Sequence, residues 1–188
     1  MCAGSAVFSP LHKFRVAPTE RVGVIGVGGL GHLAIQFAAK MGCQVVVLST
    51  TESKREEALA LGATEFHVFG DSHPPVLEPL DHLLVTSSRQ PNWDAVFQVM
   101  APGGTIYALT VDMGDMKVPY LPLVMKALRI QGSLPATRGS QREMLDFAAR
   151  DRIKPVVMTF PLSRDGIEEA METLREGRMR YRGVLVHE

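Results

Sequence analysis

The chain has 188 residues, of which 46% are hydrophobic and 21% charged, and its formal net charge is zero. That length suffices for one full domain, or for one domain and part of another. Without a basic cluster, a signal peptide or an apolar run of roughly 20 residues, we expect neither nucleic acid nor membrane as a partner. The cysteines, Cys2 and Cys43, are far apart, so we expect a reduced, cytoplasmic setting.

Residues 21–42 predict a strand, a tight turn and a helix in direct succession. The turn carries glycines at positions 26, 28 and 31, and Gly42 follows the helix. The first glycine allows the turn, the second lets backbone approach a pyrophosphate, and the third lets the helix pack on the strand. The helix N-terminus then offers N–H groups and a positive dipole end to phosphates. Glycine turns of this kind also occur without a ligand, so the turn alone does not establish a dinucleotide site, and the residues that follow are needed as evidence.

A second buried strand, residues 44–48, completes a β-α-β unit and is followed by the residues that select the dinucleotide. NAD-binding proteins usually place an acid at this point, where it accepts hydrogen bonds from the adenosine ribose. This chain has Ser49, Thr50, Thr51 and Lys54 instead. Hydroxyl groups and a cation suit a 2′-phosphate, so the loop predicts NADP rather than NAD, although Glu52 opposes this interpretation.

The same loop has a purely structural interpretation. Ser53 and Glu56 have the spacing of a capping box for the next helix, in which case Lys54 and Arg55 are solvated. Both interpretations can hold together, because capping would use Ser53 and leave Ser49, Thr50 and Lys54 available.

Strands and helices continue to alternate along the next part of the chain. We expect strands at 64–69, 82–86, 105–111 and 129–133, and helices at 53–61, 92–100 and 121–128. This pattern predicts an α/β fold with a doubly wound, parallel, six-stranded sheet. Such sheets bind ligands beyond the C-terminal ends of their strands, which adds Thr86 and Thr110 to the candidate site. Residues 70–75 resemble a linker that interrupts the fold without dividing domains.

The pattern changes after about residue 137. Helices are expected at 141–150 and 165–176, and strands at 156–160 and 183–186. Because a six-stranded sheet is already complete, we expect this tail to belong to another layer or domain. It is too short to form a good core alone.

Five segments, in this order, resemble the zinc-dependent medium-chain alcohol dehydrogenases, and within them the NADP-dependent cinnamyl alcohol dehydrogenase branch. They are residues 2–11, 26–33, 49–59, 143–149 and 180–184. The resemblance implies a Rossmann domain at 16–138, a connecting segment of the catalytic domain at 1–15, and an incomplete C-terminal part of that domain at 139–188.

The resemblance also implies a reaction, in which a primary alcohol and an aldehyde interconvert by hydride transfer with NADP(H) at a zinc-polarised oxygen. Cys2 would be a zinc ligand and Arg182 would reach the cofactor pyrophosphate. From the residues alone, Cys2 is more typical of an inert thiol and Arg182 equally of a solvated side chain. The expected cofactor contacts are Gly26, Gly28, Gly29, Leu30, Gly31, Ser49, Thr50, Thr51, Lys54, Thr86, Thr110 and Arg182.

The chain departs from the family in ways that limit its expected chemistry. The preceding lobe, its zinc ligands and its proton-relay residue have no counterpart here, and Ala6 stands where the branch usually has Thr. A catalytic zinc needs three protein ligands, and only Cys2 can be named. We assign no catalytic residue and expect low activity from this chain alone. The alternative is a non-catalytic NADP(H)-binding module; a methyltransferase would want an acid near Ser49.

Two further expectations concern surfaces. Without the lobe, the apolar faces that carry Leu11, Phe14, Ile167, Met171 and Leu174 should be partly exposed. The expected sixth strand, as far as Leu134, could pair edge to edge with a second copy in a homodimer.

Overall fold

The computed structural model describes residues 1–70, 74–133 and 136–187. They form two compact units, Met1–Ile153 and Lys154–Glu188. Parts of two expected features, the linker-like stretch at 71–73 with His73 and the strand end at Leu134, lie outside the described residues. The functional boundaries expected after residues 15 and 138 stay predictions.

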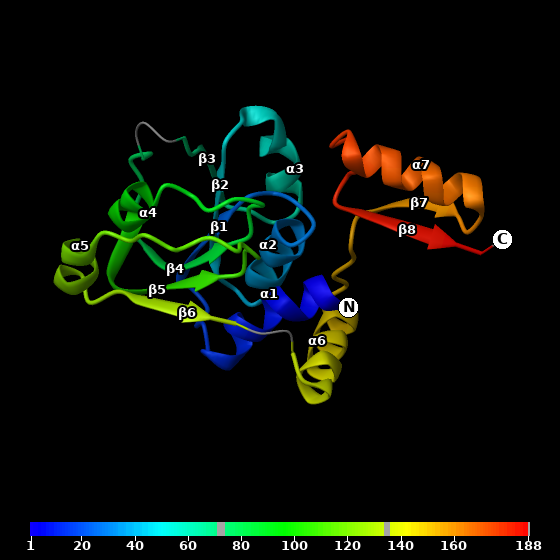
Figure 1. The fold of residues 1–188 in the computed structure, drawn as a ribbon. Helices are drawn as coiled ribbons and strands as arrows, with labels where there is room; N and C mark the ends of the chain where they lie inside the picture. Colours follow the sequence, from blue (N-terminus) through cyan, green and yellow to red (C-terminus); the bar gives the residue numbers. More distant parts are fainter. Residues whose placement is uncertain (71–73, 134–135, 188) are drawn as a thin grey trace. The chain divides into compact units, whose positions relative to one another are not determined.

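The first unit is built on one parallel sheet of six strands in the order β3-β2-β1-β4-β5-β6. This confirms the expected α/β, doubly wound sheet. In Figure 1, α2 and α3 lie on one side of the sheet and α4 and α5 on the other. Right-handed crossovers that run outward from β1 in two directions require this arrangement. The strands are β1 Arg21–Ile25, β2 Gln44–Ser49, β3 Glu65–Val68, β4 Leu80–Val85, β5 Met100–Ala108 and β6 Arg129–Gly132.

Five helices of this unit lie near their expected positions, a helix over residues 2–13 was not expected, and two element boundaries differ. The helices are α1 Cys2–Lys13, α2 Gly31–Lys40, α3 Arg55–Ala60, α4 Trp93–Val99, α5 Tyr120–Met125 and α6 Arg138–Arg150. First, β5 begins at Met100, within the expected helix, and ends at Ala108, before the expected end of that strand at Val111. Second, a 3₁₀ turn, η1 Glu52–Lys54, precedes α3 and neither helix start has a side-chain cap. The capping box at Ser53 therefore does not form.

The core explains the near-continuous apolar sequences of the central strands. Both faces of the sheet are covered, so Val22, Val24, Val46 and Leu48 are fully buried. The burial of a parallel strand on both faces removes the alternation seen in half-exposed strands. The hydrophobic runs in the sequence therefore predicted these strands correctly.

Helix α1 corrects one expectation. Leu11 was expected on an exposed face, but it is only 1% exposed. The reason is that α1 packs on α2 and α6 within the same unit. Its Phe8 ring lies 5.3 Å from the Phe37 ring and 5.6 Å from the Phe147 ring, centre to centre. Phe14, just beyond the helix end, is 38% exposed, as expected.

The second unit contains β7 Val157–Pro161 paired in parallel with β8 Arg182–Val186, and α7 Arg164–Arg175. The helix approaches β7 closely, since a Cβ on Gly166 would lie 2.2 Å from the Pro161 carbonyl oxygen. The opposite face of α7 leaves its apolar residues exposed, which confirms that expectation for Ile167, Met171 and Leu174. In the described parts of both units, no helix is long and apolar enough to cross a bilayer.

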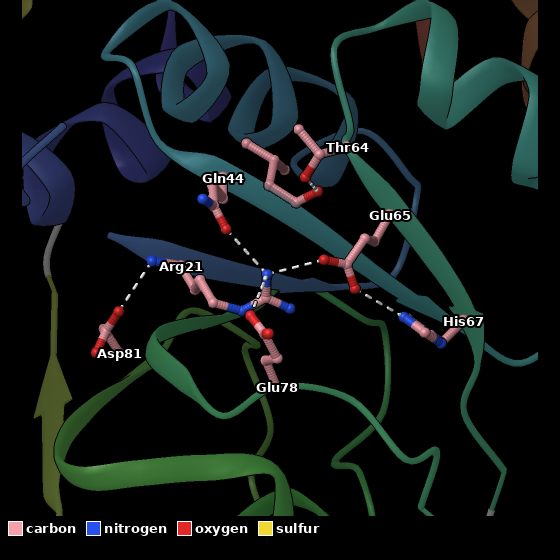
Figure 2. A network of polar contacts seen from close by, with 8 residues as sticks. Arg21, Gln44, Thr64, Glu65, His67, Glu78 and Asp81 are labelled. Carbon is pink, nitrogen blue, oxygen red and sulfur yellow. Dashed lines mark hydrogen bonds and ion pairs between the residues drawn. The ribbon is translucent and has the colours of Figure 1, made fainter. Parts of the chain in front are cut away.

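Arg21 links the amino ends of several strands, which form what we call the amino edge of the sheet (Figure 2). Its Nη1 donates to Gln44 Oε1 at 3.0 Å and to Glu65 Oε1 at 2.8 Å, and its backbone N–H donates to Asp81 Oδ2 at 2.9 Å. The Arg21 hydrogen bond lowers the pKa of the Glu65 carboxyl, against the opposing effect of partial burial; His67 lowers it further. Stability from this pair is present above the ordinary carboxyl pKa and is lost as pH falls through the lower, folded-state value.

Glu65→Gln tests this contribution. Between ~pH 5 and ~pH 3 the wild-type urea midpoint should fall as Glu65 takes up a proton. The amide cannot titrate, so the variant should start less stable at neutral pH and lose less over the same interval. Glu56→Gln, on the exposed side of α3, is the matched control and should follow the wild type. Parallel acid limbs for wild type and Glu65→Gln would contradict the assignment.

Candidate functional site

The glycine turn between β1 and α2 has a different local requirement at each glycine. Gly26 has φ +90°, and a Cβ there would lie 3.1 Å from the backbone of Ser87. A Cβ on Gly31 would lie 1.9 Å from the Gly26 carbonyl oxygen. A Cβ on Gly28 would meet nothing within 4 Å. The turn is therefore closed at Gly26 and Gly31 and open at Gly28, as the spacing predicted; contact with a cofactor stays a prediction.

Helix α2 begins without a side-chain cap, because its N-cap residue is Leu30. The N–H groups of His32 and Leu33 donate to the Gly28 and Leu30 carbonyls. The donors expected to face an anion are therefore the N–H groups of the turn just before them. The predicted contacts Gly28, Gly29 and Leu30 all lie in this open stretch. His32 stabilises this stretch. It is fully buried, and its backbone N–H donates to the Gly28 carbonyl at 3.1 Å.

His32 is a site-supporting residue that the sequence interpretation missed. Its Nδ1 lies 3.0 Å from the Gly28 carbonyl oxygen, so ring and backbone both hold the same atom. The only sequence signal is the four-residue separation on a helix start, which brings the two residues to the same face. The contact fixes the carbonyl of Gly28, where an added Cβ would meet nothing within 4 Å.

The loop after β2 brings the predicted hydroxyls together at the carboxyl ends of the strands, which is the edge of the sheet where the glycine turn also lies. Ser49 ends β2 and is 9% exposed, whereas Thr50 and Thr51 are exposed. Thr51 Oγ1 lies 2.9 Å from Ser53 Oγ. Ile25, the last residue of β1, pairs with Leu48 in β2. The glycine turn that follows Ile25 and the Ser49 that follows Leu48 are therefore neighbours.

Both cations of this loop are already paired with carboxylates. Lys54 Nζ lies 3.5 Å from Glu57 Oε2, in a half-exposed pair. Arg55 Nε donates to Glu52 Oε1, and the Arg55 guanidinium lies 4.9 Å from the centre of the Phe66 ring. Arg55 is therefore fixed against the protein, which leaves Lys54 as the more adaptable cation of the loop.

Thr86 and Thr110 reach the same edge from β4 and β5. Thr86 Oγ1 lies 2.8 Å from the Ile25 carbonyl oxygen and 2.9 Å from that of Gly26. Thr110 Oγ1 donates to the Ser87 carbonyl at 2.9 Å. Both predicted contacts thus lie beside the turn, and both hydroxyls already bind backbone.

The two remaining predicted residues, Arg182 and Cys2, lie on other elements of the chain. Arg182 begins β8 in the second unit, so its proposed contact with a pyrophosphate stays a prediction. Cys2 is the exposed first residue of α1. Within 1–70, 74–133 and 136–187, no three His, Cys, Asp or Glu side chains form a group that could hold a metal. Because zinc needs three protein ligands at a catalytic site, these residues do not by themselves fit it.

Comparison with known proteins agrees with this geometry. A family model described as zinc-binding dehydrogenase matches residues 29–150. The aldehyde reductase AdhA of Synechocystis is 35% identical over 99% of this chain and 55% of its own length. A cinnamyl alcohol dehydrogenase structure from Sorghum bicolor has a TM-score of 0.88 at 29% identity, over 98% of this chain and 53% of that one. The structure of the CAD from Helicobacter pylori complexed with NADP(H) has a TM-score of 0.83 at 25% identity, over 98% of this chain and 52% of that one.

The chain spans about half the length of the proteins that it matches. The match with the family model includes the start of α2, the 49–54 loop and both threonines, and it begins just after Gly26 and Gly28. On these grounds the chain belongs to the zinc-dependent medium-chain alcohol dehydrogenase family.

Proposed function

We propose that this chain binds NADP(H) at the edge formed by residues 26–31 and 49–54, as the coenzyme-binding part of an alcohol or aldehyde oxidoreductase. The observation that carries the proposal is the glycine turn, which is packed closed at Gly26 and Gly31 and open at Gly28, beside an uncapped helix start. When bound, the coenzyme supplies or accepts the hydride.

The chain's own residues bind and orient the coenzyme. The N–H groups of the turn would bind the pyrophosphate, and Ser49, Thr50 and Thr51 would surround the adenosine ribose with hydroxyls. Lys54 would bind the 2′-phosphate after leaving Glu57. That exchange costs little, because exposed ion pairs are worth only about 0–1 kcal/mol.

The substrate class rests on the relatives. The relatives include an aldehyde reductase and a cinnamyl alcohol dehydrogenase, which supports a primary alcohol or aldehyde as substrate. The described residues supply Cys2 as the one family-type zinc ligand and no three-ligand group, so by themselves they would not hold a catalytic zinc. We propose slow turnover by this chain alone. The alternative, a non-catalytic NADP(H)-binding module, would oxidise no NADPH in the presence of an aromatic aldehyde.

A pair of glycine variants tests the coenzyme site. Gly28→Ala adds a methyl group where nothing lies within 4 Å, so the free energy of unfolding should stay within about 0.5 kcal/mol of wild type. The methyl would project toward the pyrophosphate and should weaken NADPH binding by about tenfold or more. Gly31→Ala is the matched control for packing, and should destabilise the fold by about 1–3 kcal/mol. Normal NADPH binding by Gly28→Ala in a fluorescence titration would contradict the proposed site.

A pair of charge variants tests the preference for the 2′-phosphate. Lys54→Glu should weaken NADPH by about tenfold and leave NADH nearly unchanged. Glu57→Gln removes the carboxylate beside Lys54 and should tighten NADPH by about two- to fivefold, again without effect on NADH. Equal weakening of both coenzymes by Lys54→Glu would show a general defect instead of a lost phosphate contact.

We also propose that two copies associate through β6. This strand ends the sheet, with β5 as its one neighbour among the described strands, and its Ile130 is 36% exposed. The adjacent helix α5 has no buried residue, and Tyr120 and Met125 are 78% and 76% exposed. An unpaired strand edge beside apolar side chains is a template for pairing with a second copy.

Light scattering at micromolar concentration tests this association. We expect a mass near twice the 20.6 kDa of the chain for the wild type. Ile130→Lys should shift the mass toward the monomer, because it places a charge on the pairing edge. Val76→Lys, at a fully exposed site in another loop, is the control and should leave the mass unchanged. A wild-type mass of one chain would exclude the dimer.

A further inference from the structure

We propose that Thr86 is a positioning residue of the coenzyme site, acting on the glycine turn through its hydroxyl. The inference rests on the proposed function. Sequence reasoning expected Thr86 to contact the cofactor directly, and the hydrogen bonds of the structure favour a different role.

The Thr86 hydroxyl lies against the two carbonyls at the start of the turn. Its Oγ1 is 2.8 Å from the Ile25 oxygen and 2.9 Å from the Gly26 oxygen. A hydroxyl has a single proton to donate, so this proton is used by the backbone. Coenzyme phosphates offer only acceptor oxygens, and a hydroxyl committed in this way has no proton left for them.

The Gly26 carbonyl is the atom that fixes where α2 begins. On one side it is held by Thr86, and on the other it lies 1.9 Å from the position of a Cβ on Gly31. The Cα of Gly26 is confined in turn by Ser87, whose backbone a Cβ would meet at 3.1 Å. Rotation of this carbonyl would move the start of the helix and the N–H groups that face the pyrophosphate.

Thr110 supports the same segment from β5. Its Oγ1 donates to the Ser87 carbonyl at 2.9 Å, and the Leu109 N–H donates to the Val85 carbonyl at 3.2 Å. The contacts therefore run from β5 through residues 85–87 to the turn. Thr86 and Thr110 together fix the turn before the coenzyme arrives, and a site fixed in advance loses less entropy on binding.

The experiment compares Thr86→Val, which keeps the shape and removes the hydroxyl, with Thr86→Ser, which keeps the hydroxyl. NADPH and NADH are titrated by the fluorescence of the bound nicotinamide, and adenosine 2′-monophosphate is used as a competitor. Thr86→Val should weaken NADPH and NADH by the same factor, about tenfold. It should leave adenosine 2′-monophosphate unchanged, because that ligand has no pyrophosphate. Thr86→Ser should bind all three within about twofold of wild type.

Thr110→Val and Thr110→Ser provide a second pair, so the inference remains testable if Thr86→Val does not fold. The same pattern is expected with a smaller loss, about threefold, because Thr110 acts one step further from the turn. Wild-type NADPH affinity in both valine variants would overturn this inference alone. Equal weakening by the valine and serine variants would also overturn it, because the effect would then belong to packing. A wild-type chain that binds no NADPH would overturn the proposed function as well.

Discussion

The fold of the first unit depends on the close approach of α2 to the end of β1. Because a Cβ on Gly31 would lie 1.9 Å from the Gly26 carbonyl oxygen, only glycine allows the helix to start where it does. This approach brings an uncapped helix start to the edge where β1 meets β4. The order of strands reverses direction at β1 and β4, and open parallel sheets bind ligands at that point. One steric constraint thus places the feature that defines the candidate site.

The ion pairs at the amino ends and at the carboxyl ends of the strands differ in what they connect. At the amino edge, the Arg21 side chain is only 11% exposed and bonds two strands through Gln44 and Glu65. At the carboxyl edge, Lys54 and Glu57 are half-exposed and neighbours on one short segment. Loss of Glu65 would remove a partner from the nearly buried Arg21 guanidinium, whereas the Lys54–Glu57 pair joins neighbouring residues of one segment. The ion pair at the amino ends therefore links two strands of the sheet, and the pair at the carboxyl ends does not.

Local sequence signals predicted most of the fold because they report local physics. Apolar runs marked strands buried on both faces, and glycines marked turns with positive φ such as Gly26, Gly42 and Gly62. Helix α1 was not predicted, because Gly4 and Pro10 lie within it and its start has no acidic residue. Its stability comes from packing on α2 and α6, which also buries Leu11. The buried Ala3, Val7, Phe8 and Leu11 do follow the spacing of a helix, but Gly4 and Pro10 argued against a helix there.

The site was predictable to the same extent. The glycine spacing and the hydroxyl loop followed from sequence, and the pairing of Lys54 with Glu57 follows from their three-residue separation. The start of α3 did not follow, because the 3₁₀ turn delays it to Arg55 and leaves Ser53 outside the cap. The partners of Thr86 and His32 did not follow either. They depend on which carbonyls the folded turn presents, and that is decided by the approach of α2 to β1.

The Lys54–Glu57 pair also explains how the loop can separate two coenzymes that share every other contact. NADH would leave the pair intact, so Glu57 has no effect on its affinity. NADPH would replace one carboxylate by a more highly charged phosphate, so its gain is the difference between the two interactions with Lys54. Under the proposed function, Glu57 would lower the affinity for NADPH by the small energy of its pair with Lys54, while it holds the lysine beside the hydroxyls of the loop. Preference for the 2′-phosphate would then arise from exchange of partners at one cation, and it would require no carboxylate directed against the ribose of NAD.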